Sequence, residues 1–300
     1  MNNMNKISLF ASFKLLFLSR LKYSFIYSWA TAISCLIATK GFPPIVPFVL
    51  VVLSTLFITT SVYLYNDSED SDFDKMDDKG KEQRPMAVGT ISTKVGYIIV
   101  VTNAVIGLGL AYLINFNTMI IAFGYLILGF LYSYPGIYLK KHFLMKETIT
   151  ASGTIFYGLL GMYGTINAFS LNTFFSSIIF FIFVFTVVPL LDQSDLKQDR
   201  ARGMNSLALN TSYKSRINIA GAGMVIILLL SPITYLYLDF NIVSPILLWI
   251  LGGQVLRYII TLARDPKTAD LAKTWNTAYN FYLLSPIAFA IGVYSIPFIS

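Results

Sequence analysis

The amino-acid sequence predicts an all-α integral membrane protein, a bundle of about nine transmembrane helices in two pseudo-repeated four-helix groups around a central cavity. Composition is the first reason, because hydrophobic residues make up 56% of the 300 residues, charged residues only 12%, and the mean hydropathy is +0.67. A water-soluble domain carries about 25% charged residues, so this chain has too few charges to cover a surface in water. The second reason is that apolar runs recur along the chain and the charged residues gather between them.

The predicted transmembrane segments are runs of roughly 20 mostly apolar residues, the length that crosses a bilayer as a helix. They lie near residues 23–39, 45–65, 95–115, 117–139, 149–167, 173–191, 217–237, 243–263 and 276–298. Phe and Leu residues at helical spacing before the first segment are typical of an interfacial amphipathic helix. We therefore expect one transmembrane domain over 1–300, with residues 1–22 as an interfacial N-terminal segment.

Basic residues are distributed unevenly between the two sides of this predicted bundle. All 22 Lys and Arg residues except Lys40 fall on one side, in the N-terminal stretch and in alternate joins. Because short loops rich in Lys and Arg stay in the cytoplasm, we expect a multi-pass plasma-membrane protein with a cytoplasmic N-terminus and cytoplasmic polar loops. The net charge of +7 then reflects topology beside membrane lipid and does not indicate a nucleic-acid partner.

Two acidic runs follow the second and the sixth predicted helix. Their carboxylates and one amide repeat at spacings of three and four residues: Asn66, Asp67, Asp70 and Asp74, then Asp192, Asp195 and Asp199. In a helix that continues past the membrane, this spacing places each set on one side. Both runs lie on the predicted cytoplasmic side, so we expect them to converge on one cavity, as sites between helical repeats do.

The residue types restrict the chemistry of such a cavity. Cys35 and His142 are the single Cys and His, which excludes an internal disulfide, a Cys/His zinc site and a Ser-His-Asp triad. Carboxylate oxygens alone indicate a hard cation, and Mg²⁺ is the one usually shared between carboxylates and phosphates. Cations in the neighbouring loops are placed to hold phosphate oxygens: Arg84, Lys140, Lys141, Arg200 and Arg202. The expected ligand is a diphosphate with a lipid tail that enters the bundle.

Two simpler interpretations of the acidic runs were considered. A calcium loop is excluded, because Lys75 and Lys81 stand where the loop needs its glycine and its closing glutamate. Either run alone is compatible with a solvated helix end. Two runs with the same spacing at equivalent helix ends favour a shared site instead.

At these residues the chain resembles the UbiA superfamily of intramembrane prenyltransferases. The first motif of that family, NDxxDxxxD followed by RPxxxG, matches residues 66–89, and its second, DxxDxxxDxxxG, matches residues 192–203. A third stretch, YSxPPxxLK, appears as YSYPGIYLK over residues 132–140, with Gly136 in place of the second proline. Its Tyr-to-Lys spacing resembles the chlorophyll-synthase and archaeal-lipid branches.

The resemblance implies a Mg²⁺-dependent enzyme whose cavity opens sideways to lipid. Two Mg²⁺ ions would bridge an allylic isoprenyl diphosphate to both motifs, and the prenyl group would pass to a hydrophobic acceptor (aromatic, quinone-precursor or lipid). Asn66 would support the first cluster, Lys140 and Arg84 would stabilise the leaving diphosphate, and Tyr132 or Tyr134 would face the first isoprene unit. The resemblance makes six aspartates metal ligands and catalytic residues: Asp67, Asp70, Asp74, Asp192, Asp195 and Asp199.

Other functions stay open at this point. Terpene cyclases and lipid-phosphate phosphoribosyltransferases related to the family need the same metal-diphosphate site, so these motifs do not separate them. An ion-coupled transporter would place charges at mid-membrane and on a path to both sides. Here the acidic residues gather at one side, which ranks a transporter lower.

Two features outside the motifs also carry expectations. Glycines in the fifth segment are expected to let helices approach closely: Gly153, Gly158, Gly161 and Gly164. Arg257 lies about two turns inside the eighth segment. It either recognises an acidic acceptor or extends to the cytoplasmic interface, and the sequence does not decide between them.

Overall fold

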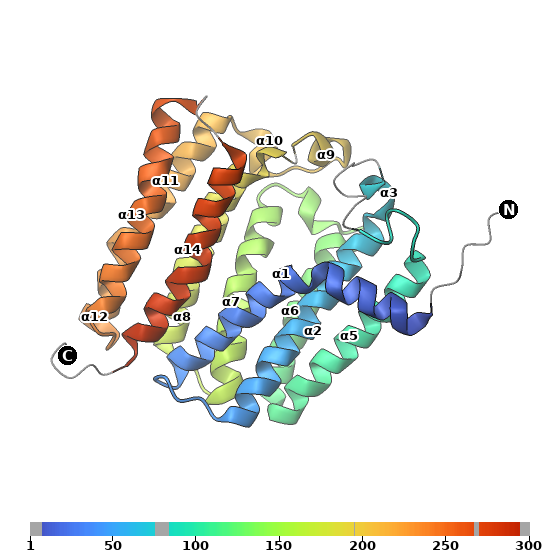
Figure 1. The fold of residues 1–300 in the computed structure, drawn as a ribbon, viewed down its shortest axis with the longest axis horizontal. Coiled ribbons are helices and arrows are strands. Elements are labelled where there is room, and N and C mark those ends of the chain that lie inside the picture. The colour runs from blue at the N-terminus through green and yellow to red at the C-terminus, as the bar shows by residue number, and fades with distance from the viewer. Residues whose placement is uncertain (1–7, 76–83, 195, 267–269, 295–300) are drawn as a thin grey trace.

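The computed structural model describes residues 8–75, 84–194, 196–266 and 270–294. Within these ranges every regular element is a helix (Figure 1). The long ones are α1 (Leu9–Ala38), α2 (Ile45–Glu69), α5 (Thr93–Ile114), α6 (Phe116–Ser133), α7 (Met145–Thr165), α8 (Leu171–Leu191), α11 (Tyr213–Leu230), α13 (Val243–Arg264) and α14 (Leu271–Gly292). The short ones are α3 (Ser71–Asp74), η1 (Leu139–Lys141), η2 (Asp192–Ser194), α9 (Leu196–Ala201), α10 (Leu207–Asn210) and α12 (Pro232–Tyr237).

The length and hydropathy of these helices confirm an all-helical membrane protein. Among the described residues, 6 helical stretches are long and apolar enough to span a bilayer: α2, α5, α6, α8, α13, and α11 together with α12. The three other predicted segments are also long helices, α1, α7 and α14, but they are not among the six stretches that are apolar enough. Nine spans and two four-helix groups therefore stay predictions.

The first helix joins the predicted N-terminal segment to the first predicted span. α1 runs without a break from Leu9 to Ala38, so residues 9–22 belong to the same helix as the first predicted span. Its N-terminal half already buries Leu16 and Arg20 against the bundle. An interfacial position for this half stays a prediction, and one of its side chains belongs to the site described below.

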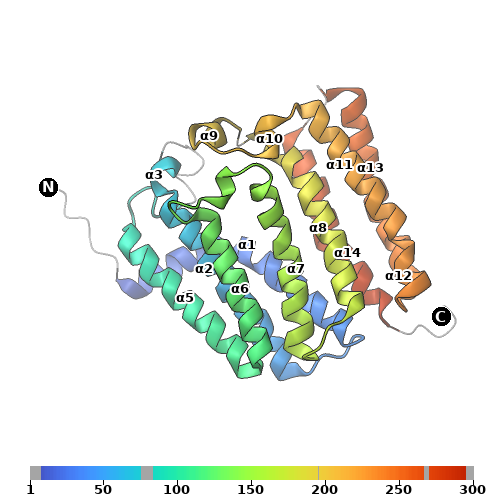
Figure 2. The same cartoon turned by 180° about the vertical axis from the view of Figure 1, so that it is seen from behind.

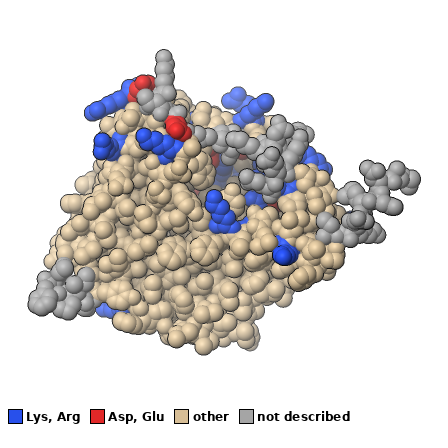
Figure 3. Space-filling model, viewed as in Figure 1, with Lys and Arg blue, Asp and Glu red and all other residues tan. Residues whose placement is uncertain are grey.

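The helices form one bundle, and three of the short elements lie at one end of it. Figures 1 and 2 show α2 and α5 on one flank, α11, α13 and α14 on the other, and α7 between them. α1 crosses the bundle and packs on α2 and α7. α3, α9 and α10 lie together at one end. The described Lys and Arg side chains gather toward the same end in Figure 3, while most of the visible surface below is uncharged.

Close packing around α7 confirms the role expected for its glycines. A Cβ on Gly161 would lie 2.6 Å from Ser34 Cβ and 3.0 Å from the backbone nitrogen of Cys35 on α1. A Cβ on Gly158 would overlap the Ser177 side chain of α8, and one on Gly164 would lie 2.7 Å from a Val51 methyl group of α2. Three neighbours therefore approach α7 to distances that only glycine allows.

Gly161→Ala is accordingly expected to destabilise the bundle by about 1–3 kcal/mol, the usual cost of overpacking. The obstacle is partly α1 backbone, which cannot turn aside as a flexible side chain can. Gly109→Ala in α5 is the matched control, because no atom lies within 4 Å of its Cβ position. Thermal unfolding in detergent should show a lower midpoint for the first variant only, and equal midpoints would contradict this account of the packing.

Candidate active site

The first acidic run keeps the one-sided arrangement that its spacing predicts. α2 ends at Glu69 and the four-residue helix α3 follows Asp70, so the chain is not a single regular helix. The helical hydrogen bonds nevertheless continue, from Asp70 N–H to Asn66 O at 2.9 Å and from Asp74 N–H to Asp70 O at 2.9 Å. Asp67, Asp70 and Asp74 are all buried on the side that faces the bundle.

The second acidic run departs from the expected continuous helix. α8 ends at Leu191, η2 follows, and α9 starts only at Leu196; Asp195 lies outside the described residues. The physical reason is a shared partner. Lys146, in the first turn of α7, places its Nζ 2.9 Å from Asp192 Oδ2 and 2.7 Å from Asp199 Oδ2. The chain must fold back for both carboxylates to reach this one ammonium group.

Cations neutralise each carboxylate of the first run. Lys140 Nζ lies 2.7 Å from both oxygens of Asp70. Arg84 and Arg202 both pair with Asp74. Because buried carboxylates without a counter-charge are costly, these contacts are what allows the run to lie inside the bundle.

The carboxylate of Asp67 has a partner from a distant helix. Arg20 of α1 donates through Nε to Oδ2 at 2.5 Å and through Nη2 to Oδ1, a bidentate pair with both side chains buried. Arg84 Nε adds a weaker contact at 3.8 Å. The N-terminal helix is thereby tied to the first acidic run.

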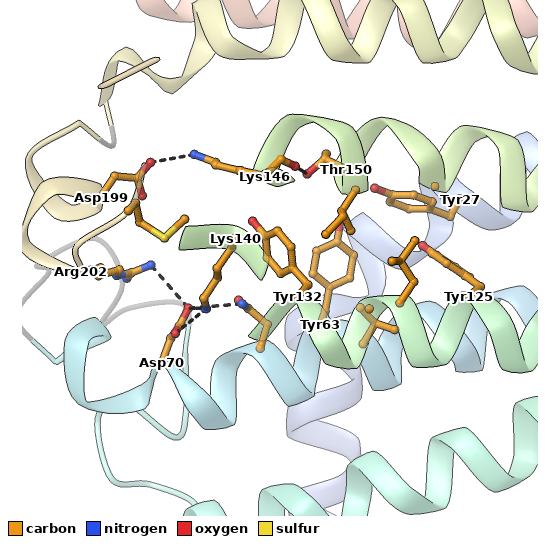
Figure 4. Close-up of a pocket in the computed structure, with 17 residues that line it drawn as sticks. Tyr27, Tyr63, Asp70, Tyr125, Tyr132, Lys140, Lys146, Thr150, Asp199 and Arg202 are labelled. Carbon is orange, nitrogen blue, oxygen red and sulfur yellow. Dashed lines mark hydrogen bonds and ion pairs between the residues drawn. The ribbon is translucent and has the colours of Figure 1, made fainter. Parts of the chain in front are cut away.

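A cavity of about 260 Å³ joins the two runs. Asp70 and Asp199, one from each run, lie at its polar end with Lys140, Lys146 and Arg202 (Figure 4). Tyr27, Tyr63 and Tyr125 lie toward the opposite end in Figure 4. Small and aliphatic residues complete the lining: Val62, Leu128, Gly129, Ile149 and Gly153. The cavity therefore has a charged end suited to a polyanion and an apolar end suited to a hydrocarbon chain.

The polar end has the chemistry of a Mg²⁺ site. Its acidic ligands are oxygen donors only, as Mg²⁺ prefers. Asp74 is not one of the lining residues, but it pairs with Arg202, which is. Its buried Oδ2 has no hydrogen-bond partner and so is available to a cation or a donor. Within the described ranges, no three His, Cys, Asp or Glu residues form a preassembled metal cluster, since each carboxylate there turns to a Lys or an Arg instead. The residues fit a Mg²⁺ ion provided that these cations move to an incoming polyanion.

Burial and charge act in opposite directions on the basic groups outside the membrane-spanning segments. Burial lowers the pKa of Lys140, and the neighbouring Asp70 only partly offsets this. For Arg84, burial also favours the neutral form, but Asp67 and Asp74 outweigh it and raise the pKa. The balance therefore raises the pKa of Arg84 and lowers that of Lys140.

The remaining predicted residues divide between the cavity and its surroundings. Asn66 and Tyr132 line the cavity, and Asn66 Nδ2 donates to Ser133 Oγ at 2.7 Å. Tyr134 is 51% exposed and Arg200 is also exposed. Lys141 places its Nζ 4.5 Å from the centre of the Tyr138 ring. None of the last three is among the described residues that line the cavity, so their roles stay predictions without structural support.

Sequence reasoning missed several residues of the site. Arg20 and Lys146 were counted only as topology signals, although each pairs with predicted aspartates. Arg20 carried one weak signal, a charge between the apolar residues Leu18 and Leu21, but Lys14 and Lys22 in the same segment share that signal. Tyr27, Tyr63 and Tyr125 had none, because 19 tyrosines are scattered along the chain and only tertiary packing brings these three together.

Glu147 holds the loop that carries Asp199 and Arg202. Its buried carboxylate accepts the backbone N–H of Leu207 at 2.7 Å, which fixes the start of α10 to the start of α7. Glu147→Ala is expected to leave that buried N–H unpaired and to destabilise the protein by about 1–3 kcal/mol. Glu147→Gln keeps an acceptor oxygen and is the matched control. A lower thermal midpoint in the alanine variant alone is the expected result, and equal midpoints in the two variants would contradict it.

Known proteins are similar to this chain over most of its length. The model of the UbiA prenyltransferase family matches residues 27–285. The chain is 29% identical to a digeranylgeranylglyceryl phosphate synthase from Sulfolobus acidocaldarius over 259 residues, 85% of this chain and 88% of that protein. It is 26% identical to the enzyme of the same name from Sulfurisphaera tokodaii over 251 residues, 82% of this chain and 86% of that protein.

Solved structures share the fold. One solved structure comes from work on the biosynthesis of digeranylgeranylglyceryl phosphate synthase in membranes. It superposes with a TM-score of 0.74 at 21% identity, over 93% of this chain and 97% of that one. A UbiA homolog from Archaeoglobus fulgidus bound to GPP and Mg²⁺ superposes with a TM-score of 0.67 at 16% identity, over 94% of this chain and 100% of that one.

Proposed function

This chain belongs to the UbiA prenyltransferase family, and from that premise we propose that it transfers a prenyl group from an allylic isoprenyl diphosphate to a phosphorylated, lipid-like alcohol. The observation that carries the proposal is that one cavity holds Asp70 and Asp199 at one end and tyrosines at the other. An isoprenyl diphosphate has the same two-part character, a polyanionic head on a hydrocarbon tail.

The diphosphate head would occupy the polar end. Asp67, Asp70, Asp74, Asp192 and Asp199 are the described residues proposed to hold Mg²⁺, with Asp195 completing the second motif. Bound Mg²⁺ supplies the Lewis acidity that neutralises charge on a leaving diphosphate. We propose two ions, one for each motif.

Basic side chains of the same site would then change partners. Lys140, Arg84 and Arg202 now neutralise Asp70 and Asp74, and a diphosphate offers them stronger, multidentate acceptors. Turned toward the diphosphate oxygens, these three residues would stabilise the negative charge that develops there as the bond breaks. Lys146, between Asp192 and Asp199, would do the same for the second motif.

The reaction proposed here breaks the bond between allylic carbon C1 and the diphosphate oxygen, and diphosphate leaves with the electron pair. The allylic cation that remains would lie beside aromatic rings, whose faces stabilise positive charge. Of the tyrosines labelled in Figure 4, Tyr132 lies nearest the polar end, with Lys140 Nζ 5.7 Å from its ring centre. An acceptor hydroxyl oxygen then forms the new C–O bond and releases its proton.

A second cavity supports an acceptor with an anionic head and a long apolar tail. It measures about 800 Å³, lies between α1, α8 and α14, and shares Tyr27, Tyr63 and Thr150 with the first cavity. Its lining is mostly aromatic and aliphatic, but Lys22 brings a positive charge. The relatives named digeranylgeranylglyceryl phosphate synthases point to the same class of acceptor, a prenylated glycerol phosphate.

The orientation in the membrane is part of the proposal. Figure 3 shows Lys and Arg side chains gathered toward the end that carries the site, so we propose that this end faces the cytoplasm. A water-soluble diphosphate head made in the cytoplasm would then reach the site directly.

Product analysis of the purified protein tests the proposed acceptor. With Mg²⁺ and geranylgeranyl diphosphate, we expect prenylation of geranylgeranylglyceryl phosphate, none of an aromatic quinone precursor, and only slow hydrolysis without acceptor. Removal of Mg²⁺ by a chelator is expected to abolish turnover, and added Mg²⁺ to restore it. A cyclised hydrocarbon without acceptor, or prenylation of the aromatic compound alone, would overturn the proposed acceptor.

A further inference from the structure

A polar groove on the outer surface, distant from the aspartate cavity in the fold, has no role in the proposed reaction. It lies between α13 and α14, which run side by side on one flank of the bundle (Figure 1), and measures about 440 Å³. Its described lining residues all come from the two facing helices, and the polar ones include Gln254, Arg257, Lys273 and Asn280. We propose that this groove binds one anionic phospholipid, with its phosphate at Arg257 and Lys273.

The first argument is uncompensated positive charge. Arg257 and Lys273 both line the groove and both are exposed. In the part of the chain that the structure describes, neither forms an ion pair with a carboxylate. The nearby Asp270 is occupied at the start of α14, where Oδ1 accepts the backbone N–H groups of Ala272 and Lys273. Two cations therefore line one groove without a carboxylate partner among the described residues, and an external anion would neutralise both.

The second argument is polarity at membrane depth. Arg257 lies about two turns before the end of α13, and Asn280 about two and a half turns after the start of α14. Gln254 lies one turn deeper on α13 and is also exposed. Among the described residues, no hydrogen bond to protein satisfies the side-chain amide of Gln254 or Asn280. Polar side chains facing lipid are costly and usually functional, and the phosphate and ester oxygens of a lipid would satisfy both amides.

Extension of Arg257 to the interface does not account for this arrangement. A long arginine reaches the headgroup layer by itself, but the short amides of Gln254 and Asn280 cannot follow it. The groove also holds its shape through contacts between its walls. Tyr258 Oη lies 2.9 Å from Thr274 Oγ1 and 3.2 Å from the Asp270 carbonyl, and Lys273 Nζ lies 5.5 Å from the centre of the Tyr258 ring.

The apolar part of the groove suits an acyl chain. Leu251, Val255, Phe281 and Leu284 continue the groove away from the two cations, toward the middle of the membrane. A membrane phospholipid has this order of groups, a phosphate at the interface followed by a hydrocarbon chain. Basic pockets between helices at the cytoplasmic side bind anionic headgroups in this way.

The test is native mass spectrometry of the full-length protein in mild detergent, titrated with phosphatidylglycerol. We expect one lipid to bind more tightly than the rest, and phosphatidylcholine to bind more weakly. In the double variant Arg257→Gln/Lys273→Gln, binding of that lipid should weaken roughly 30-fold, about fivefold for each cation removed. Arg264→Gln is the matched control, because Arg264 is exposed at the end of the same helix but does not line the groove. It should leave the affinity unchanged.

Two further experiments distinguish a lipid from free phosphate as the bound anion and control for misfolding of the variant. Inorganic phosphate at the same concentration should not displace the lipid, because it cannot occupy the apolar part. Gln254→Leu/Asn280→Leu keeps both charges and should weaken binding by a smaller factor while the protein stays folded. Equal affinity in the double-cation variant and the wild type would overturn the proposal. So would displacement by phosphate alone, or a concentration-dependent dimer that this variant abolishes.

Discussion

Asp70→Asn is expected to reduce prenyl transfer by roughly 10³-fold or more, at the upper end of what one electrostatic contact supplies to catalysis. Asp70 lines the cavity, lies 2.7 Å from Lys140 Nζ through both oxygens, and has Arg202 at 3.7 Å. An amide at this position keeps the shape but loses the charge that would hold Mg²⁺. Turnover with geranylgeranyl diphosphate and acceptor, followed by product extraction, measures the loss.

Asp72→Asn is the matched control for that variant. Asp72 lies in the short helix that follows Asp70, but its side chain is 85% exposed, and among the described residues its ion-pair partner is Lys75. Its loss should change turnover less than about twofold, since surface ion pairs contribute little. Similar losses in both variants would mean that general charge at this end, and not the position of Asp70, sustains the reaction.

Arg20→Gln is expected to destabilise the protein by about 3–5 kcal/mol, the usual cost of leaving one buried charge without its partner. The carboxylate of Asp67 is buried, and Arg20 supplies both of its close hydrogen bonds. Arg84 at 3.8 Å compensates only in part. The thermal midpoint in detergent should therefore fall clearly.

The double variant Arg20→Gln/Asp67→Asn separates charge from packing. Because it removes both charges and keeps the shape of the Asp67 side chain, it should recover most of the midpoint lost in the single variant. Recovery of stability without recovery of turnover would assign Asp67 to the reaction and Arg20 to its support. Double and single variants that are equally unstable would contradict this account of the pair.

Local sequence pattern predicted the first acidic run well. Asn66, Asp67, Asp70 and Asp74 share one side because three- and four-residue spacing is a local property of a helix, and the structure keeps its hydrogen bonds through the break at Asp70. The close approach at Gly161 was also predictable, since small residues at helical spacing mark contact between helices.

Long-range partners were beyond the sequence. The pairing of Arg20 with Asp67 and of Lys146 with Asp192 depends on how α1 and α7 pack against the rest of the bundle. The same holds for the break after Leu191, where the second run folds back toward Lys146 instead of extending α8. Periodicity describes one helix at a time, so it does not show which cation a carboxylate will meet.

The central claim is that both acidic motifs serve one diphosphate site. The most direct test is the affinity for geranylgeranyl thiolodiphosphate, an analogue that resists cleavage, in the presence and absence of Mg²⁺. We expect Mg²⁺-dependent binding by the wild type and by Asp72→Asn, and a loss of roughly tenfold or more in both Asp70→Asn and Asp199→Asn. Unchanged, Mg²⁺-dependent binding by Asp199→Asn would contradict the claim, because the second motif would then take no part in holding the diphosphate.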